Sequence, residues 1–445
     1  MIEKIVYILG KRRAIKFVLF AFLMVLGALI DTALTYAILP LTSLITSVDN
    51  YATNSYYILL EKYLTVSNFS EAIAIYAIII AASYIFRNVY MLIVNGLRYR
   101  FLAESKAYVS TNLFSTIANK PYSYFTATNT SAIQRICIND VSRLFGVIDS
   151  CLNVIINFIT LVLIAAVLLA ENILLTVSAT VILGLLTVLV NRPIAKKTSE
   201  LSKVYSEHYT SMLQWTQQFV GSLKTVLTTE KQPFFVERFS YHNKKFTQNE
   251  GRFSFISLVT GYVLNAVVMG LGFFYVAVLA IQGENITLYI PTLALFAMAA
   301  MKLMPSISSF ATHLNNIRYN EQGLYSIYEQ MKNNEKDAQQ IYSNIMIESN
   351  DESQTLTEGI KIDDISFHFE DTQNDLFKHM SLEIPANKSV AFIGTTGSGK
   401  TTLADIILGL HKPYAGTITA DGHDIFCEHE WWASQIGYIP QTIYL

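Results

Sequence analysis

Charged residues are scarce in this sequence: they make up 15% of its 445 residues, whereas soluble globular domains average about 25%. Hydrophobic residues reach 52%, and the mean hydropathy is positive at +0.36. This shortage of charge excludes an ordinary water-soluble enzyme, because so few charged side chains are unusual for the surface of a large soluble chain. The composition therefore predicts a membrane protein.

The sequence also has no excess of basic residues and few cysteines. The 32 Lys and Arg residues are balanced by 34 Asp and Glu residues, which gives a net charge of −2. A nucleic-acid binder held by a strongly basic field is therefore excluded. The three cysteines, Cys137, Cys151 and Cys427, fit neither a disulfide framework nor a metal-site spacing. We interpret them as small, buried apolar residues.

Six apolar runs are long enough to cross a bilayer, for which about 20 residues are needed. They cover residues 14–45, 72–97, 144–170, 173–190, 253–281 and 286–304. The first run is too long for the apolar part of a cleaved signal peptide and lacks a small-residue cleavage site. The pattern predicts a polytopic α-helical membrane domain with six transmembrane helices.

The basic residues indicate how this domain is oriented. The loops on one side, residues 46–71, 171–172 and 282–285, hold a single basic residue, Lys62. The other side holds Lys11, Arg12, Arg13, Arg98, Arg100, Lys106, Lys120, Arg135, Arg143, Arg192, Lys196 and Lys197. The positive-inside rule then places both termini in the cytoplasm. We expect a multi-pass protein of the cell (inner) membrane.

The loops on the basic side are long and rich in helix formers. Residues 98–143 and 192–252 contain few Gly or Pro breakers, so we expect helices that continue beyond the bilayer as two hairpins. Their tips fall near residues 121–131 and 215–224, where they would press on a cytoplasmic domain.

The composition becomes polar after Met331. We divide the chain into a transmembrane domain (1–330), a linker (331–357) and the N-terminal part of a nucleotide-binding domain (358–445). Within the last region, residues 360–369 and 381–384 alternate like strands. The fold class of this region is a partial α/β P-loop domain.

One motif carries specific chemistry. The short apolar run 389–393 resembles a buried strand, and a G-x-x-x-x-G-K-[ST] loop and a helix-compatible stretch follow it, which is the context of a phosphate-binding loop. The loop residues are Gly394, Thr395, Thr396, Gly397, Ser398, Gly399, Lys400, Thr401 and Thr402. Lys400 would reach the β- and γ-phosphates, the Thr401 hydroxyl would ligate Mg²⁺, and Thr402 would contact the α-phosphate. ATP and Mg²⁺ are the predicted cofactors.

Two further residues have open interpretations on pattern alone. Phe369 stands at the end of a strand-like stretch, where it either stacks on an adenine ring or belongs to the core. Gln441 follows the strand-like stretch 436–440, where it is either a ligand contact or a surface amide.

Six spans, long cytoplasmic helices and a fused C-terminal phosphate loop together resemble the ABC exporters. Residues 408–418 with Asp421 and Gly422 are similar to the family's stretch after the loop, and residues 436–441 are similar to its Q-loop. The resemblance implies that Phe369 stacks on adenine and that Gln441 contacts Mg²⁺. It also implies a homodimer in which ATP lies between the two nucleotide-binding domains.

Within that family the sequence most resembles the bacterial lipid-linked oligosaccharide flippases, through residues 84–87, 303–306 and 436–445. In those proteins basic residues line the cavity and meet the substrate's pyrophosphate. The resemblance gives this role to Arg87 and Lys302, which stand in apolar spans where charge is costly. Lys302 lies near a span end, so it is alternatively a snorkelling side chain.

The same flippases carry an external amphipathic helix after the first span. Residues 49–64 place Tyr56, Tyr57 and Tyr63 at mainly helical spacing, so the resemblance makes these tyrosines substrate contacts. The alternative is an interfacial loop with tyrosine anchors. Gly261 and Ser309 stand where the family has further basic residues.

The family's LSGGQ signature, Walker B carboxylates and switch histidine do not occur in this sequence. We therefore expect a chain truncated after the Q-loop, with no catalytic residue of its own. The resemblance predicts an ATP-hydrolysing translocase of lipid-linked oligosaccharide or a related lipid. The alternatives are a drug, peptide or lipid A exporter, and a truncated ATP-binding membrane subunit that does not hydrolyse ATP.

Overall fold

The structure is a computed structural model that describes residues 1–46, 58, 69–171, 173–281, 286–342, 356–369, 372 and 374–439. The chain forms two compact units. The first comprises Met1–Ser115 and Ser131–Met331, and the second comprises Thr116–Thr130 and Lys332–Leu445. A short segment from the helical part of the sequence, Thr116–Thr130, thus belongs to the same unit as the C-terminal region.

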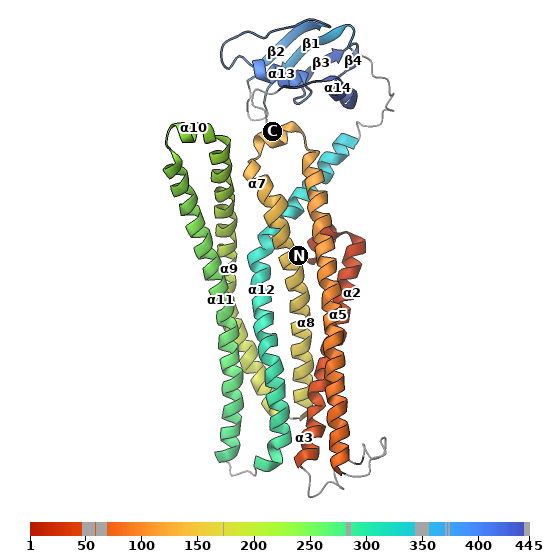
Figure 1. The fold of residues 1–445 in the computed structure, drawn as a ribbon, viewed down its shortest axis with the longest axis vertical. Helices are drawn as coiled ribbons and strands as arrows, with labels where there is room; N and C mark the ends of the chain where they lie inside the picture. Colours follow the sequence, from red (N-terminus) through yellow and green to blue (C-terminus); the bar gives the residue numbers. More distant parts are fainter. Residues whose placement is uncertain are drawn as a thin grey trace. The chain divides into compact units, whose positions relative to one another are not determined.

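The first unit is helical, and its long helices lie lengthwise along one another (Figure 1). Its elements are α1 (Ile2–Leu9), α2 (Lys11–Tyr36), α3 (Ile38–Thr46), α5 (Phe69–Ala118), α7 (Thr130–Gln134), a π-helical turn (Arg135–Asp140), α8 (Val141–Glu171), α9 (Ile173–Gly221), α10 (Leu223–Thr228), α11 (Gln232–Ile281) and α12 (Ile286–Tyr342). The 50 residues of α11 span about 75 Å at 1.5 Å per residue, more than twice the hydrocarbon thickness of a bilayer.

In the described part of the chain, four helical stretches are long and apolar enough to cross a membrane. They are Lys11–Ile45, Phe69–Ala118, Thr130–Ala170 and Gln232–Phe274. The first three stretches contain the runs 14–45, 72–97 and 144–170, and the fourth contains the run 253–281 as far as Phe274. The other two runs, 173–190 and 286–304, fall on α9 and α12, which are also helical.

The helices α2 and α5 approach each other closely at a glycine. A Cβ atom on Gly27 would lie only 2.4 Å from the sulfur of Met91. The hydroxyl of Tyr90 donates to the Leu23 carbonyl at 2.7 Å, so the pair is also joined by a hydrogen bond. A small residue at position 27 therefore sets the spacing of the two helices.

A buried arginine joins three helices. Arg143 on α8 donates to the hydroxyls of Ser206 (2.6 Å) and Ser202 (2.8 Å) on α9, and to the carbonyl of Tyr319 on α12 (2.5 Å). The side chain of Asp140, at the end of the π-helical turn, lies 3.9 Å from the Arg143 guanidinium. Both side chains are almost fully buried, with exposures of 5% and 1%. The arginine thus fixes the packing of α8 against α9 and α12.

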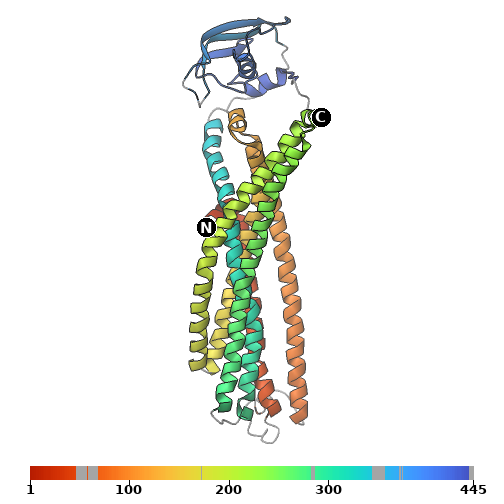
Figure 2. The ribbon, with the colours of Figure 1, turned by 90° about the vertical axis from the view of Figure 1, so that its left-hand side faces the viewer.

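The helices α9 and α11 run side by side and are joined through α10 (Figures 1 and 2). The predicted hairpin over residues 192–252 therefore consists of the far parts of these two helices. Proline stands inside α9 at position 193, where it removes one helical hydrogen bond and favours a bend.

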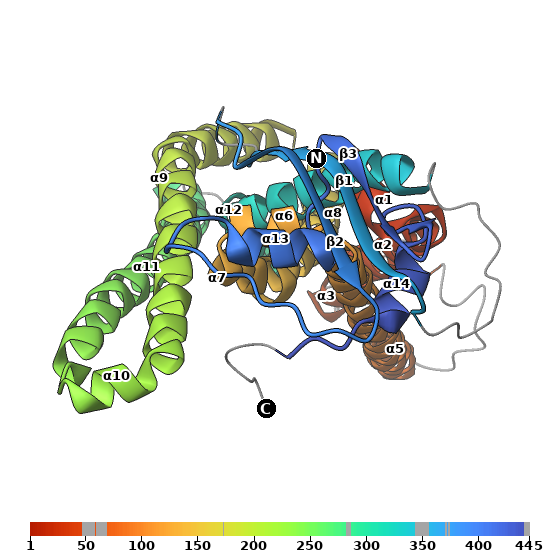
Figure 3. The same ribbon diagram turned by 90° about the horizontal axis from the view of Figure 1, so that it is seen from above.

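The second unit is built on a small antiparallel sheet. Its strands are β1 (Gly359–Phe367), β2 (Phe377–Pro385), β3 (Ala415–Ala420) and β4 (His423–Asp424), in the order β2-β1-β3-β4. Its helices are α6 (Tyr122–Ala127), α13 (Lys400–Ile407) and α14 (His429–Gln435). Figures 1 and 3 show α13 and α14 on the same face of the sheet. The core beneath them consists of Ile362, Ile365, Phe367, Leu403, Ile406, Ile418, Ala420, Ile425 and Trp432.

A single carboxylate ties the start of this unit to the turn between β3 and β4. Asp421 accepts hydrogen bonds from the backbone N–H groups of Gly359 (2.8 Å), Thr357 (2.5 Å) and Glu358 (2.8 Å). These bonds, led by the one from Gly359, lower the pKa of Asp421 to about 2. The group is therefore ionised at neutral pH and holds the entry to β1 in place.

One strand prediction is wrong. Residues 389–393 form no strand: Val390 is 45% exposed and Ile393 is 95% exposed, while Phe392 is half-buried and packs against the core. A run that is apolar on both faces is typical of a strand buried between neighbours in a parallel sheet. In the described part of the chain the sheet consists of β1 to β4, and none of these strands pairs with residues 389–393. The strand-like residues 436–439 are equally unpaired.

We expect the substitution Arg143→Met to lower the free energy of unfolding by about 3 kcal/mol or more, because it removes three buried hydrogen bonds and one of the two cations that face Asp140, the other being Arg135. Thermal or denaturant unfolding of the purified protein in detergent measures this loss. The matched control is Arg100→Met, since Arg100 pairs with Glu104 at an exposed position and such pairs contribute under about 1 kcal/mol. Equal losses in the two variants would contradict the prediction.

Candidate functional site

The predicted phosphate loop adopts a conformation that requires its glycines. Gly397 and Gly399 have φ angles of +86° and +88°, which residues with a side chain rarely adopt. A Cβ atom on Gly399 would also lie 2.8 Å from the ring of Phe377. The predicted residues 394–402 therefore form one continuous turn that leads into α13.

The side chain of Lys400 folds back over this loop. Its ammonium donates to the carbonyls of Gly394 and Thr395, each at 2.9 Å. A lysine ammonium has three donors, so these two bonds position the charge and leave one donor for a ligand oxygen. The geometry holds a positive charge at the mouth of the loop.

The first turn of α13 adds further donors. Gly399 is its N-cap residue, and the first helical hydrogen bond runs from the Leu403 N–H to the Gly399 carbonyl at 2.8 Å. The N–H groups of Lys400, Thr401 and Thr402 therefore have no acceptor within the helix. Backbone donors, a helix N-terminus and a fixed ammonium are what a phosphate group requires.

A magnesium ion fits this site only together with phosphate. Thr401 supplies one exposed hydroxyl at the start of α13, and Mg²⁺ ordinarily completes its coordination with waters and substrate phosphates. Within the ranges that the structure describes, no group of three or more His, Cys, Asp or Glu residues is arranged to hold a metal. The predicted ligand Gln441 lies outside the described residues.

Phe369 lies just beyond the end of β1 with 42% of its surface exposed. Its ring packs edge-on against Phe367, with centroids 5.1 Å apart, while Phe367 itself is 5% exposed and belongs to the core. Phe367 thus fills the core position of this aromatic pair, and Phe369 keeps a ring face available for another planar group.

The sequence predicts that the hairpin tip 121–131 presses on the C-terminal domain, but it does not identify the residues that make the contact. In the second unit, Tyr122 of α6 packs its ring edge-on against His411, with centroids 5.4 Å apart. His411 also packs against Phe367 (5.6 Å) and Phe369 (5.7 Å) and is 9% exposed. One buried histidine therefore joins α6 to the aromatic pair beside β1.

In the helical unit, Arg87 and Lys302 meet at one carboxylate. The Arg87 Nε atom lies 3.0 Å and the Lys302 Nζ atom 2.9 Å from the same oxygen of Asp31. The side chain of Asp31 is only 10% exposed, and those of the two cations are 24% and 25% exposed. Two cations against one carboxylate leave a cluster of net positive charge, which we call the Asp31 cluster. The sequence signal for Asp31 was an acidic residue inside the first apolar run.

The surroundings of the Asp31 cluster differ from what the resemblance implies. A Cβ atom on Gly261 would lie 2.2 Å from the Ser308 hydroxyl and 3.2 Å from the Ser308 Cβ atom, so a larger side chain there requires the hydroxyl to turn away and α12 to shift slightly. The Ser309 hydroxyl accepts a hydrogen bond from the Asn157 amide at 3.0 Å. The tyrosines predicted as substrate contacts, Tyr56, Tyr57 and Tyr63, lie outside the described residues.

Both units are similar to known proteins. Residues 15–303 match the family model of the ABC transporter transmembrane region, and residues 377–445 match the ABC transporter model. The structure of a bacterial Atm1-family ABC exporter with ATP bound is similar in fold, with a TM-score of 0.64 at 16% identity over 93% of this chain and 68% of that one.

Curated relatives match through shorter segments. The chain is 41% identical over 69 residues to the uncharacterised ABC transporter ATP-binding protein YfiC of Bacillus subtilis, covering 16% of this chain and 11% of the relative. It is 31% identical over 74 residues to the ATP-dependent lipid A-core flippase of Vibrio cholerae, covering 17% of this chain and 13% of the relative. The chain therefore matches only a small part of these relatives' lengths.

We expect the substitution Gly399→Ala to weaken nucleotide binding at least tenfold, because the loop cannot keep its φ of +88° or its spacing from Phe377. Titration with a fluorescent ATP analogue measures the affinity. Gly437→Ala is the matched control, since a Cβ atom there meets nothing within 4 Å. An unchanged affinity in Gly399→Ala would show that this turn is not the binding loop.

Proposed function

The chain belongs to the ABC transporter family, and from this we propose that it is the membrane and nucleotide-binding chain of an ATP-driven exporter for a lipid-linked anion. The observation that carries the proposal is the phosphate loop with its positioned Lys400, joined in one chain to a helical unit that holds the Asp31 cluster. The proposed organisation is a transmembrane domain (1–330) with six crossings, a linker (331–357) and part of a nucleotide-binding domain (358–445).

The phosphate loop is the proposed site of ATP. Lys400 and the N–H groups of the first turn of α13 would hold the phosphates, and the adenine would stack on the exposed face of Phe369. Thr401 and Gln441 would hold Mg²⁺. The metal, when bound, neutralises phosphate charge.

We propose that two copies of the chain work together as a homodimer, with ATP between their nucleotide-binding domains. The route from nucleotide to membrane domain would run through Phe369, His411 and Tyr122, because each ring contacts the next. Tyr122 lies four residues beyond the end of α5, so a displacement of its ring is passed to a helix that enters the membrane domain. ATP that binds one conformation of the transporter more tightly than the other would then shift the equilibrium between the two conformations.

The Asp31 cluster is the proposed contact for the substrate's anionic group. Arg87 and Lys302 share one carboxylate oxygen, so neither cation has a carboxylate of its own. A diphosphate carries more charge and more acceptor oxygens than one carboxylate, and it would replace Asp31 as their partner. Lipid-linked oligosaccharide has a diphosphate of this kind on a polyprenyl chain.

Orientation and location follow from the basic residues. Loops between the proposed crossings are basic on one side, which supports a cytoplasmic N-terminus and a cytoplasmic nucleotide-binding domain. The proposed location is the inner membrane.

A second candidate substrate is lipid A, because a named lipid A-core flippase is among the relatives. Lipid A also carries phosphate on a lipid, so the Asp31 cluster suits both substrates. Relatives named for multidrug resistance also match this chain, so a drug or peptide exporter stays an alternative. The Asp31 cluster, which suits an anion, favours a lipid with phosphate over it.

We expect Lys400→Met to weaken binding of Mg²⁺–ATP at least tenfold while leaving the helical unit folded. Lys400 donates to two carbonyls of the loop, and methionine keeps an apolar side chain of similar length, so the substitution removes the charge without opening a large cavity. Lys412→Met on the same unit is the charge-matched control. ATP turnover is measured in parallel: binding without turnover would favour the non-hydrolysing subunit over an exporter that acts through this chain alone.

For the substrate, we expect Arg87→Ala to weaken binding of a polyprenyl diphosphate by about tenfold or more. Asp31→Asn, which removes the competing carboxylate, should strengthen it. Tryptophan fluorescence or thermophoresis in detergent measures both, with Lys16→Ala as the control and the uncharged polyprenol as the blank. Parent-like affinity in both variants would remove the Asp31 cluster from the substrate site and leave the nucleotide proposal standing.

A further inference from the structure

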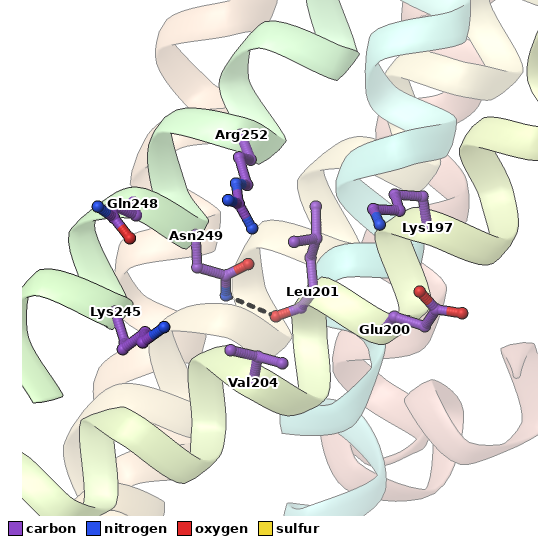
Figure 4. Close-up of a pocket in the computed structure, with 8 residues that line it drawn as sticks. All are labelled: Lys197, Glu200, Leu201, Val204, Lys245, Gln248, Asn249 and Arg252. Carbon is purple, nitrogen blue, oxygen red and sulfur yellow. Dashed lines mark hydrogen bonds between the residues drawn. The ribbon is translucent and has the colours of Figure 1, made fainter.

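A pocket of about 190 Å³ opens between α9 and α11, and its lining shares no residue with the Asp31 cluster or the phosphate loop (Figure 4). It is lined by Lys197, Glu200, Leu201, Val204, Lys245, Gln248, Asn249 and Arg252. Its volume is about six times the roughly 30 Å³ that a water molecule occupies in the liquid. The pocket is therefore large enough for a small polar group.

The pocket lies at the level where the apolar parts of both helices end. On α9 the apolar run ends at Val190, and Lys197 follows about 10 Å further along the helix. On α11, Arg252 directly precedes Phe253, the first residue of the next apolar run. The polar headgroup layer extends about 5–8 Å beyond the hydrocarbon on each side, so the Arg252 end of the pocket lies within it and Lys197 stands just beyond it. Side chains of a helix lean toward its N-terminus, so the long side chain of Lys197 on α9 reaches back toward this layer.

The charge of the pocket is positive and uncompensated. Lys197, Lys245 and Arg252 face a single carboxylate, that of Glu200. In the described part of the chain, none of the three cations forms an ion pair. Three cations around one cavity attract an anion, and a bound ligand can supply it.

The pocket also contains a buried side-chain amide, that of Asn249, which needs a hydrogen-bond donor from a ligand. Asn249 is 3% exposed, and its amide nitrogen donates to the Leu201 carbonyl at 2.7 Å, the dashed line in Figure 4. Its oxygen is buried and accepts no hydrogen bond within the described residues. Figure 4 shows that oxygen on the side of the pocket where Arg252 lies. A buried acceptor without a donor is costly, so the pocket suits a ligand that brings a donor as well as an anion.

We propose that this pocket binds the headgroup of an anionic glycerophospholipid. The phosphodiester is held by Lys197, Lys245 and Arg252, and a headgroup hydroxyl donates to the oxygen of Asn249. Phosphatidylglycerol has both groups, whereas phosphatidylcholine has no hydroxyl and places a quaternary ammonium beside the three cations. Because the ligand contacts α9 and α11 together, it fastens the base of the hairpin that these helices form.

The first test compares two lipids on the purified chain in detergent. Phosphatidylglycerol should raise the thermal unfolding midpoint and remain bound in native mass spectrometry, and phosphatidylcholine should do neither. Phosphatidylethanol, which has the same singly charged phosphodiester but no headgroup hydroxyl, should bind more weakly than phosphatidylglycerol. Equal effects of phosphatidylglycerol and phosphatidylcholine would overturn the proposal.

The second test uses matched variants. The triple variant Lys197→Ala, Lys245→Ala, Arg252→Ala should lower the apparent affinity for phosphatidylglycerol at least tenfold. The control variant Lys196→Ala, Lys203→Ala, Lys244→Ala removes equal charge from exposed positions of the same helices, outside the pocket, and should retain the lipid. Equal loss in both variants would mean a diffuse charge effect and would overturn the proposal.

The third test separates a lipid from a free phosphate ester. Glycerol phosphate, which has the phosphate and hydroxyls but no acyl chains, should compete with phosphatidylglycerol only at concentrations at least a hundredfold higher. Stabilisation by glycerol phosphate at the concentration that suffices for the lipid would overturn the assignment to a lipid headgroup.

Discussion

Charge that is withdrawn from water must be compensated within the protein, and this constraint governs the helical unit. Asp31 holds Arg87 and Lys302 on one oxygen, while Arg143 is satisfied by two hydroxyls, a carbonyl and the neighbouring Asp140. In each case the charged group joins helices that are far apart in the sequence, so it selects one packing of the bundle. The buried charges thus help to determine which faces of the helices meet.

The two clusters differ in how fully they are satisfied. Both terminal nitrogens of the Arg143 guanidinium have buried hydrogen-bond partners on α9 and α12, which gives this side chain a packing role. Among the described residues, the two cations of the Asp31 cluster pair with one carboxylate, and both are partly exposed. This difference is the reason why a binding role is proposed for the Asp31 cluster and not for Arg143.

Local patterns predicted the parts of the molecule that local rules determine. The apolar runs and the breaker-poor segments gave long helices, and the glycine loop gave the turn ahead of α13, because a helix or a turn depends on residues close in sequence. The pairing of Asp31 with Lys302 joins residues 271 positions apart, and no sequence periodicity carries that information. The same holds for Tyr122 and His411. The strand expected at residues 389–393 failed for a related reason, since a strand exists only through neighbours that pair with it.

The close approach of α11 and α12 at Gly261 constrains how this bundle changes over evolutionary time. A side chain gained at position 261 meets the Ser308 hydroxyl first and the Ser308 Cβ atom at 3.2 Å. It therefore requires that hydroxyl to turn away and α12 to shift by a few tenths of an ångström. Loss of the hydroxyl at position 308 removes the closer of the two contacts, so a change on α12 makes a change on α11 easier, and we expect the two positions to change together.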